Sequence, residues 1–156
     1  MDHCFPELGY DVSSEIIQKL KPLELYLTNE SFAKTNIAIT ENMICEAALC
    51  GELDVFDYLH KRINVEIDHS KLMKSAISGG NVEICELVYD RDFHYNISDL
   101  VWDACKSRQK SSFVWLFDKA VGYDLKELLF VFLHPAVFTD FSEGIEFLTE
   151  MGIDVK

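Results

Sequence analysis

Glycine and proline are scarce in this sequence: its 156 residues include only 7 glycines and 3 prolines. Because these residues mark tight turns and strand ends, their scarcity argues against a fold of many short strands and favours long helices. Apolar residues make up 49% and charged residues 26%, which is the composition of a globular chain. We therefore expect an all-α protein that folds as one continuous domain.

Long apolar runs and basic residues are also in short supply. The longest apolar run, Leu128 to Leu133, is far shorter than the roughly 18 residues of a membrane span, so no membrane partner is expected. Only 14 basic residues stand against 27 acidic ones, a formal net charge of −13. Such a surface repels nucleic acid, and it suits either a basic partner or solubility alone.

Motifs for catalysis and for metal or cofactor binding are missing. The five cysteines are odd in number and show no CxxC spacing, which predicts a reducing, cytoplasmic compartment. Cys45 and Cys50 are expected to pack as small apolar residues. No two histidines have the i, i+4 spacing of a helical zinc pair, and no glycine-rich phosphate loop occurs. We expect no cofactor, no metal and no enzyme, although a Cys–His dyad assembled by folding stays open.

A repeated segment is the clearest positive signal. Four segments of similar pattern begin at alanines that are spaced almost evenly along the chain, and each segment ends on an apolar pair. They are AALCGELDVFDYL from Ala47, AISGGNVEICELV from Ala76, ACKSRQKSSFVWL from Ala104 and AVFTDFSEGIEFL from Ala136. A small residue lets two helices approach closely, and the glycine that follows one turn later, Gly51 or Gly80, suits a left-handed helix end. The pattern predicts helix–turn–helix units that bury their apolar faces by stacking.

The units resemble ankyrin repeats. GELDVFDYL and GNVEICELV are similar to the ankyrin turn and second helix, and EFLTEMGIDV, residues 146–155, is similar to the ankyrin ending. The resemblance covers residues 40–156 and implies about four repeats in a solenoid that binds other proteins. The TPLH segment is missing and the spacing is shorter than the roughly 33 residues of an ankyrin repeat, so the β-hairpin fingers are expected to be short or absent. In style, these repeats resemble the ankyrin proteins of large DNA viruses.

The two ends and the third unit depart from the pattern. Residues 1–39 are expected to form a helical N-terminal cap, although residues 13–34 are also faintly similar to an F-box, a recruiter of ubiquitin-ligase scaffolds. The first helix of the fourth unit should end at Pro135, which cannot continue a helix without losing a hydrogen bond. The third unit matches least well, because Arg108 and Lys110 replace the turn glycine and the next apolar residue.

The ankyrin register predicts which residues are buried and which meet a partner. The core positions would be Ile44, Ala47, Met73, Ala76, Val101 and Ala104. The partner-binding concave face would comprise Asn42, Glu46, Lys71, Lys74, Ser75, Asp99, Trp102 and Asp103, with Cys45 beside Glu46. Trp102 is either an interface anchor or a core residue that fills a gap in the third unit. Trp115 is expected in the core.

These observations favour an ankyrin-like adaptor or inhibitor that binds one protein, a host protein if the viral resemblance holds. Three alternatives stay open: an acidic mimic of nucleic acid, a self-assembling homo-oligomer and an F-box-like ubiquitin-ligase adaptor. The irregular third unit, around Trp102 and Arg108, is the expected location of specific function.

Overall fold

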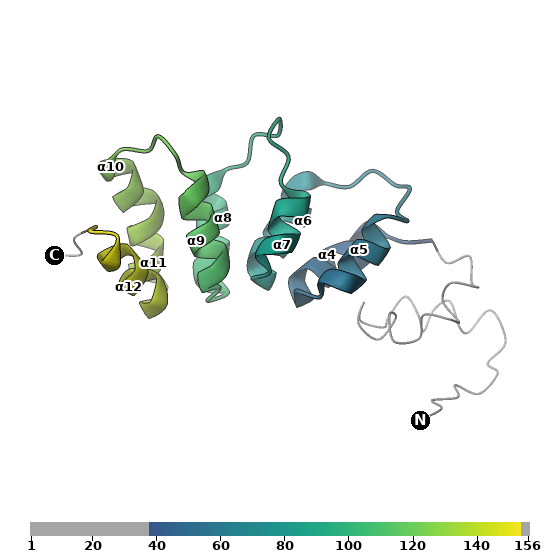
Figure 1. Ribbon diagram of the computed structural model, residues 1–156, viewed down its shortest axis with the longest axis horizontal. Coiled ribbons are helices and arrows are strands. Elements are labelled where there is room, and N and C mark those ends of the chain that lie inside the picture. The colour runs from purple at the N-terminus through teal and green to yellow at the C-terminus, as the bar shows by residue number, and fades with distance from the viewer. Residues whose placement is uncertain (1–37, 154–156) are drawn as a thin grey trace, which may run out of the picture.

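The chain is all-helical throughout the part described by the computed structural model, residues 38–153 (Figure 1). The predicted N-terminal cap and F-box-like segment lie outside these residues, apart from the last two positions of the cap. The helices follow one another in pairs. The pairs are α4 (Glu41–Cys50) with α5 (Leu53–His60), α6 (His69–Gly79) with α7 (Val82–Val88), α8 (Ile97–Lys106) with α9 (Lys110–Lys119), and the continuous α10 (Leu125–Leu128), η1 (Leu129–Leu133) and α11 (His134–Phe138) with α12 (Ser142–Glu150).

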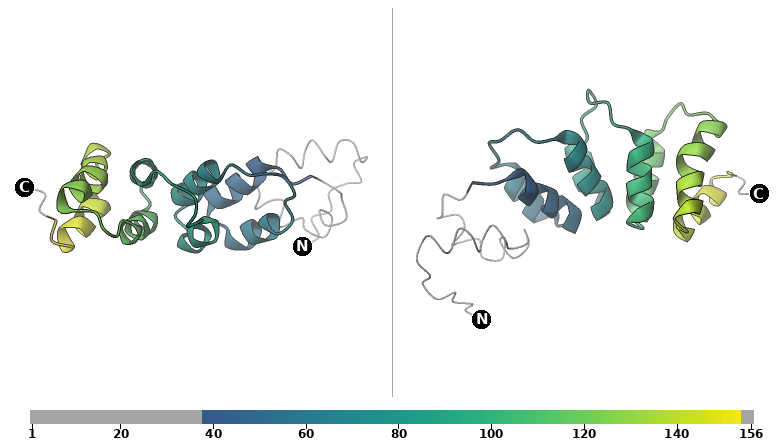
Figure 2. Two further views of the ribbon diagram at one scale, coloured as in Figure 1. Left: turned by 90° about the horizontal axis from the view of Figure 1, so that it is seen from above. Right: turned by 180° about the vertical axis from the view of Figure 1, so that it is seen from behind.

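The pairs lie side by side in two layers (Figure 2). One layer holds the first helix of each pair, α4, α6, α8 and α10–α11, and the other holds α5, α7, α9 and α12. We call the side of the first layer that faces away from the second layer the first-helix face. The connections 61–68, 89–96 and 120–124 join successive pairs along one edge and contain no strand.

Each first helix begins at a polar cap. Thr40, Asp68, Asn96 and Asp124 follow one another at equal intervals, and each side chain accepts a hydrogen bond from a backbone N–H of the first turn. These bonds satisfy donors that a helix start leaves without partners. The caps therefore repeat more regularly than the alanines, whose last interval is longer than the others.

A left-handed residue ends the first helix or follows it closely in every pair. Gly51 and Gly80 have φ of 71° and 78°, while Arg108 and Asp140 occupy the same turn with φ of 55° and 53°. Glycine adopts this conformation freely, whereas a residue with a Cβ is strained by about 1–2 kcal/mol. The third pair thus keeps the helix turn, and the expectation that it is the least regular unit is wrong.

The irregular pair is the fourth, and Pro135 does not end its first helix. The helix continues to Phe138 because its middle, Leu129–Leu133, is a π-helix in which the His134 N–H donates to the Leu129 carbonyl five residues back. A proline in a helix removes one donor and crowds the preceding turn. The wider π turn immediately before it makes room for the ring. The prediction that this helix ends at Pro135 is therefore wrong.

The predicted core is confirmed. All six core positions named from the alignment are fully buried, each with an exposed fraction of 0%. Trp115 is also buried, and its indole N–H donates to Glu86 at 2.6 Å. Small side chains at the alanine positions let α4, α6 and α8 pack against one another, as the pattern predicted.

Two kinds of packing hold the pairs together. At the junction of α4 and α6, a Cβ added to Gly79 would come within 2.1 Å of the Ala48 carbonyl oxygen, so the two backbones nearly touch. At the junction of the third and fourth pairs, phenylalanine rings fill the space instead. Their centroids lie 5.3–6.3 Å apart in edge-to-face pairs that join Phe113, Phe117, Phe132, Phe141 and Phe147.

Candidate protein-binding face

Trp102 lies at the centre of an aromatic group on the first-helix face. The half-buried indole on α8 meets the rings of His134 and Phe138 edge-on, with centroids 5.7 and 5.4 Å away. Phe130 stacks on His134 at 6.1 Å. Phe130 and Phe138 are 71% and 74% exposed. We call Trp102, Phe130, His134 and Phe138 the aromatic patch; Trp102 bridges two helices within it and is neither a core residue nor fully exposed.

The π turn arranges the three rings from the fourth pair. Phe130, His134 and Phe138 recur at i, i+4 and i+8, and an α-helix of about 3.6 residues per turn would carry such a series steadily around its axis. A turn closed by i→i+5 hydrogen bonds holds more residues and reduces that drift. His134 consequently has Phe130 on one side and Phe138 on the other, at 6.1 and 6.2 Å.

Sequence reasoning found Trp102 and missed the other members of the patch. The expected helix end at Pro135 left no prediction for Phe138 on a helix surface, and the apolar run Leu128 to Leu133 gave no sign that Phe130 is exposed. One signal could have found them. The interval from Ala104 to Ala136 is longer than the two before it, by about one helical turn in the first helix.

The structure brings Asn42 and Lys71 together at the opposite end of the first-helix face. The Lys71 ammonium donates to the Asn42 side-chain oxygen at 2.8 Å and to Glu41 at 3.1 Å. Glu41 also accepts the Asp68 backbone N–H at 2.9 Å. The backbone donor and then Lys71 lower the pKa of Glu41, while Glu41 raises the pKa of Lys71. These contacts tie α4 to the start of α6, so two predicted partner-binding residues already bind each other.

Lys74, Asp99 and Asp103 lie between that ionic group and the aromatic patch. Burial raises the pKa of the half-buried Asp103, the positive charges of Lys74 and Lys106 oppose this rise, and Asp99 adds to it. Among the described residues no ion pair within 4 Å reaches Asp99 or Asp103. Among the described residues the two carboxylates next to Trp102 therefore have no ion-pair partner within 4 Å, although Lys74 and Lys106 are near enough to act on Asp103.

The remaining predicted residues differ in accessibility. Glu46 is exposed on α4, as expected for a partner-binding position. Ser75 is half-buried, and its hydroxyl donates to the Lys71 carbonyl at 3.2 Å. Ser75 also lies beside Cys45, which is buried at the α4–α6 junction and not open to a partner.

The cysteines of the described part of the chain are mostly buried. Cys85 and Cys105 are fully buried, and burial raises their pKa values to about 11 and about 12. Burial also raises the pKa of Cys45. Such thiols are protonated at neutral pH and react poorly. Cys50 is exposed, so the expectation of burial is confirmed for Cys45 and wrong for Cys50.

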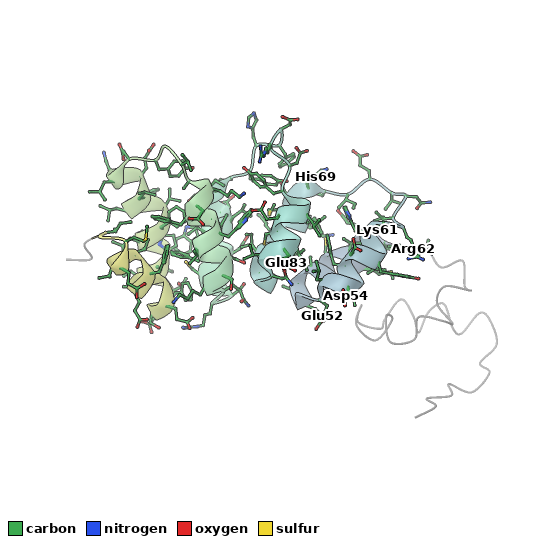
Figure 3. The ribbon with its side chains drawn as sticks, in the orientation of Figure 1. Glu52, Asp54, Lys61, Arg62, His69 and Glu83 are labelled. Carbon is green, nitrogen blue, oxygen red and sulfur yellow. The ribbon has the colours of Figure 1, made fainter. Side chains whose placement is uncertain are left out.

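The second-helix layer carries charges that follow the helix dipoles. Glu52 and Asp54 lie at the start of α5, and Lys61 and Arg62 lie beyond its end (Figure 3). Glu83 takes the corresponding position in the first turn of α7. Acidic side chains at a helix start and basic ones at its end offset the partial charges of the backbone. These residues therefore have a structural explanation that needs no partner.

A groove of about 780 Å³ opens between the connections that follow α5 and α7. His60 and His69 line it together with Val65 and Leu87, which are 48% and 55% exposed. His69 stacks on Phe93 with centroids 5.7 Å apart. Acidic and basic side chains are mixed around its rim, so its charge favours no particular class of ligand.

Within residues 38–153 no three His, Cys, Asp or Glu side chains are grouped so that they could hold a metal ion. The same part of the chain contains no helix with the length and apolar character needed to cross a bilayer. No protein-family model, curated protein or solved structure matches the sequence.

Proposed function

We propose that this chain is a non-enzymatic binding module with ankyrin-like repeats, whose first-helix face engages another protein around Trp102. The aromatic patch carries the proposal. Two largely exposed phenylalanines, Phe130 and Phe138, next to a half-buried tryptophan form an apolar surface that water solvates poorly. Large aromatic side chains of this kind dominate the binding energy of protein interfaces.

The helix-pair architecture supports the same role. Stacked pairs whose caps repeat at equal intervals present their first helices as one continuous surface, which is the surface that repeat proteins use for recognition. Lys74, Asp99 and Asp103 supply polar groups at the border of the apolar centre, as expected of a protein interface. The resemblance to viral ankyrin proteins makes host proteins the first class to test.

A comparison of capture by matched variants tests the proposal. The full chain and its Trp102→Ala variant would be used as baits, with Leu87→Ala on the second-helix layer as the control. Leu87 is 55% exposed on α7, so its replacement should leave the fold intact, and circular dichroism would verify that Trp102→Ala also stays folded. We expect the affinity for a saturable partner to fall by about tenfold or more with Trp102→Ala and to be unchanged with Leu87→Ala. Equal retention by both variants would contradict the proposal.

Self-association is a second candidate, favoured by further exposed apolar residues in the fourth pair. Leu125 is 60% and Val137 53% exposed there, in addition to Phe130 and Phe138. Sedimentation equilibrium across a wide range of concentrations tests this candidate. A dimer that Val137→Ser dissociates would support it, and a monomer at the highest concentration would exclude it.

A further inference from the structure

We propose that the aromatic patch receives a basic amphipathic helix of the partner protein. This inference rests on the proposed function and names the chemistry of the partner. The apolar residues of that helix would contact Phe130 and Phe138, and its lysine or arginine side chains would extend toward Asp99 and Asp103.

The secondary structure of the occupant follows from what the patch can offer. Phe130 and Phe138 provide no hydrogen-bond partners, so within the patch only the Trp102 indole and the His134 imidazole could pair with a peptide backbone, and the described residues contain no strand whose edge could do so. An extended segment laid on these rings would bury backbone N–H and C=O groups without partners. A helix satisfies its own backbone and presents only side chains, so it loses no backbone hydrogen bond by covering the rings.

The dimensions of the patch agree with a short helix. Phe130 and Phe138 lie about two turns apart on one helix, which corresponds to about 12 Å. Residues one turn apart on a partner helix rise by about 5 Å, so about two to three of its turns would cover this length. Apolar side chains at i, i+3, i+4 and i+7 form a stripe of this size.

The charge of the occupant follows from the carboxylates beside Trp102. Asp99 and Asp103 precede and follow Trp102 on α8, and among the described residues neither carboxylate has an ion-pair partner. Aromatic faces attract cations as well, and Lys106 already lies 5.8 Å from the Trp102 ring. The overall charge of −13 adds a long-range attraction for a basic partner. Lys74 and Lys106 flank the site and would repel basic side chains of the partner helix. Those side chains must therefore lie directly over Asp99 and Asp103.

Three designed peptides separate this inference from general attraction to an acidic protein. The probe is a peptide of about 14 residues, containing leucine at i, i+3, i+4 and i+7 spacing and lysine elsewhere. The first control has the same composition with its leucines at i, i+2, i+4 and i+6, and the second has glutamate in place of lysine. Binding of each to the full-length chain would be measured by calorimetry. We expect the helical lysine peptide to bind about tenfold more tightly than either control.

Protein variants then locate the binding. Phe130→Ser with Phe138→Ser should weaken the helical lysine peptide by about tenfold, and Asp99→Asn with Asp103→Asn by about threefold. Leu87→Ser and Glu83→Gln on the second-helix layer are the matched controls and should change its affinity less than twofold. Phe130 and Phe138 are largely exposed, so their replacement should leave the fold intact, which circular dichroism would verify.

Several outcomes would overturn the inference. They are equal binding of both lysine peptides, tighter binding of the glutamate peptide, equal losses in the patch and control variants, and a homodimer that Phe130→Ser dissociates. If the peptides fail while a natural partner still requires Trp102, the helix inference fails and the proposed function stands. If a natural partner is indifferent to Trp102→Ala, the proposed function fails whatever the peptides do.

Discussion

The junctions at the two ends of the stack solve the same packing problem with opposite means. Between α4 and α6 the backbones nearly touch, because Gly79 has no side chain and Ala48 has a small one. Between the third and fourth pairs, a cluster of phenylalanines around the fully buried Phe113 fills the space. The stability of the first junction should therefore fall when atoms are added, and that of the second when atoms are removed.

The surfaces next to the two junctions differ as well, and only one of them is the proposed binding surface. Near α4 and α6, the face outside the tight junction is polar, and Lys71 is held by Glu41 and Asn42. Near α8 and α11, the rings inside the junction continue into exposed rings on the surface, where Trp102 contacts Phe138. The aromatic end of the molecule thus combines a core that is sensitive to lost atoms with the surface that we propose for a partner.

The largest expected effect is at the aromatic junction. Phe113→Ala removes a ring that packs against Phe132, Phe141 and Phe147, leaving a cavity that should lower the free energy of unfolding by about 3–5 kcal/mol. Urea denaturation would measure it, and Phe113→Leu should cost clearly less. A loss below about 1 kcal/mol for the alanine variant would mean that the rings do not determine the stability of this junction.

The glycine junction should respond to one added methyl group. Gly79→Ala places a Cβ against backbone that cannot move freely, so we expect a loss of about 1–3 kcal/mol. Ser107→Ala, at the corresponding position of the third pair, is the control and should change little. Cys45 and Cys105 lie in the two different junctions, so thiol labelling reads each one separately. Gly79→Ala should accelerate labelling of Cys45 more than that of Cys105, and equal acceleration would show that the junctions open together.

The turn that follows the first helix offers a smaller test. Gly80→Ala forces a Cβ into a backbone with φ of 78°, which should cost about 1–2 kcal/mol. Arg108→Ala at the equivalent position of the third pair should cost less, because a residue with a Cβ already occupies the left-handed conformation and only an exposed hydrogen bond to the Asp140 carbonyl is lost. The melting temperatures of both variants would show which substitution costs more stability. Equal losses of stability in the two variants would show that the left-handed backbone does not account for the cost of Gly80→Ala.

The smallest effect is a pH dependence between α7 and α9. Lys119, and then the Trp115 indole, donate to Glu86 and lower its pKa below the ordinary 4.5. A carboxylate with a lowered pKa stabilises the fold above about pH 4.5, and this contribution disappears as the pH falls through the pKa of the folded state. Glu86→Gln should therefore lower the melting temperature at pH 7, by an amount worth less than about 1 kcal/mol because the pair is partly solvated.

The same variant should differ less from the wild type at pH 3 than at pH 7, because the stabilising charge of Glu86 is lost as the pH falls through its lowered pKa. A difference of equal size at pH 3 and pH 7 would attribute the effect to packing and not to charge.

Local patterns were sufficient to predict the helical class, the approximate unit length and the core. Ala47, Ala76 and Ala104 are buried because helical spacing places them on the apolar side of each first helix, and that spacing is visible in the sequence. The even period of the four caps is equally visible in the sequence, at Thr40, Asp68, Asn96 and Asp124, although the alanine spacing does not reveal it.

The candidate site was only partly accessible to such patterns. Trp102 stood out by its size, and its position on α8 followed from the alignment. Phe130 and Phe138 could not be placed, because the sequence around Pro135 indicates a helix end and the π turn that carries the helix through it forms only in the packed structure.

The sequence by itself determined the helix pairs, their spacing and their buried alanines, since these depend on residues a few positions apart. The tertiary structure alone decided which unit is irregular, which rings reach the surface and how Trp102 meets Phe138. Those features depend on the register between α8 and α11, which is set by non-local packing of side chains from two different pairs.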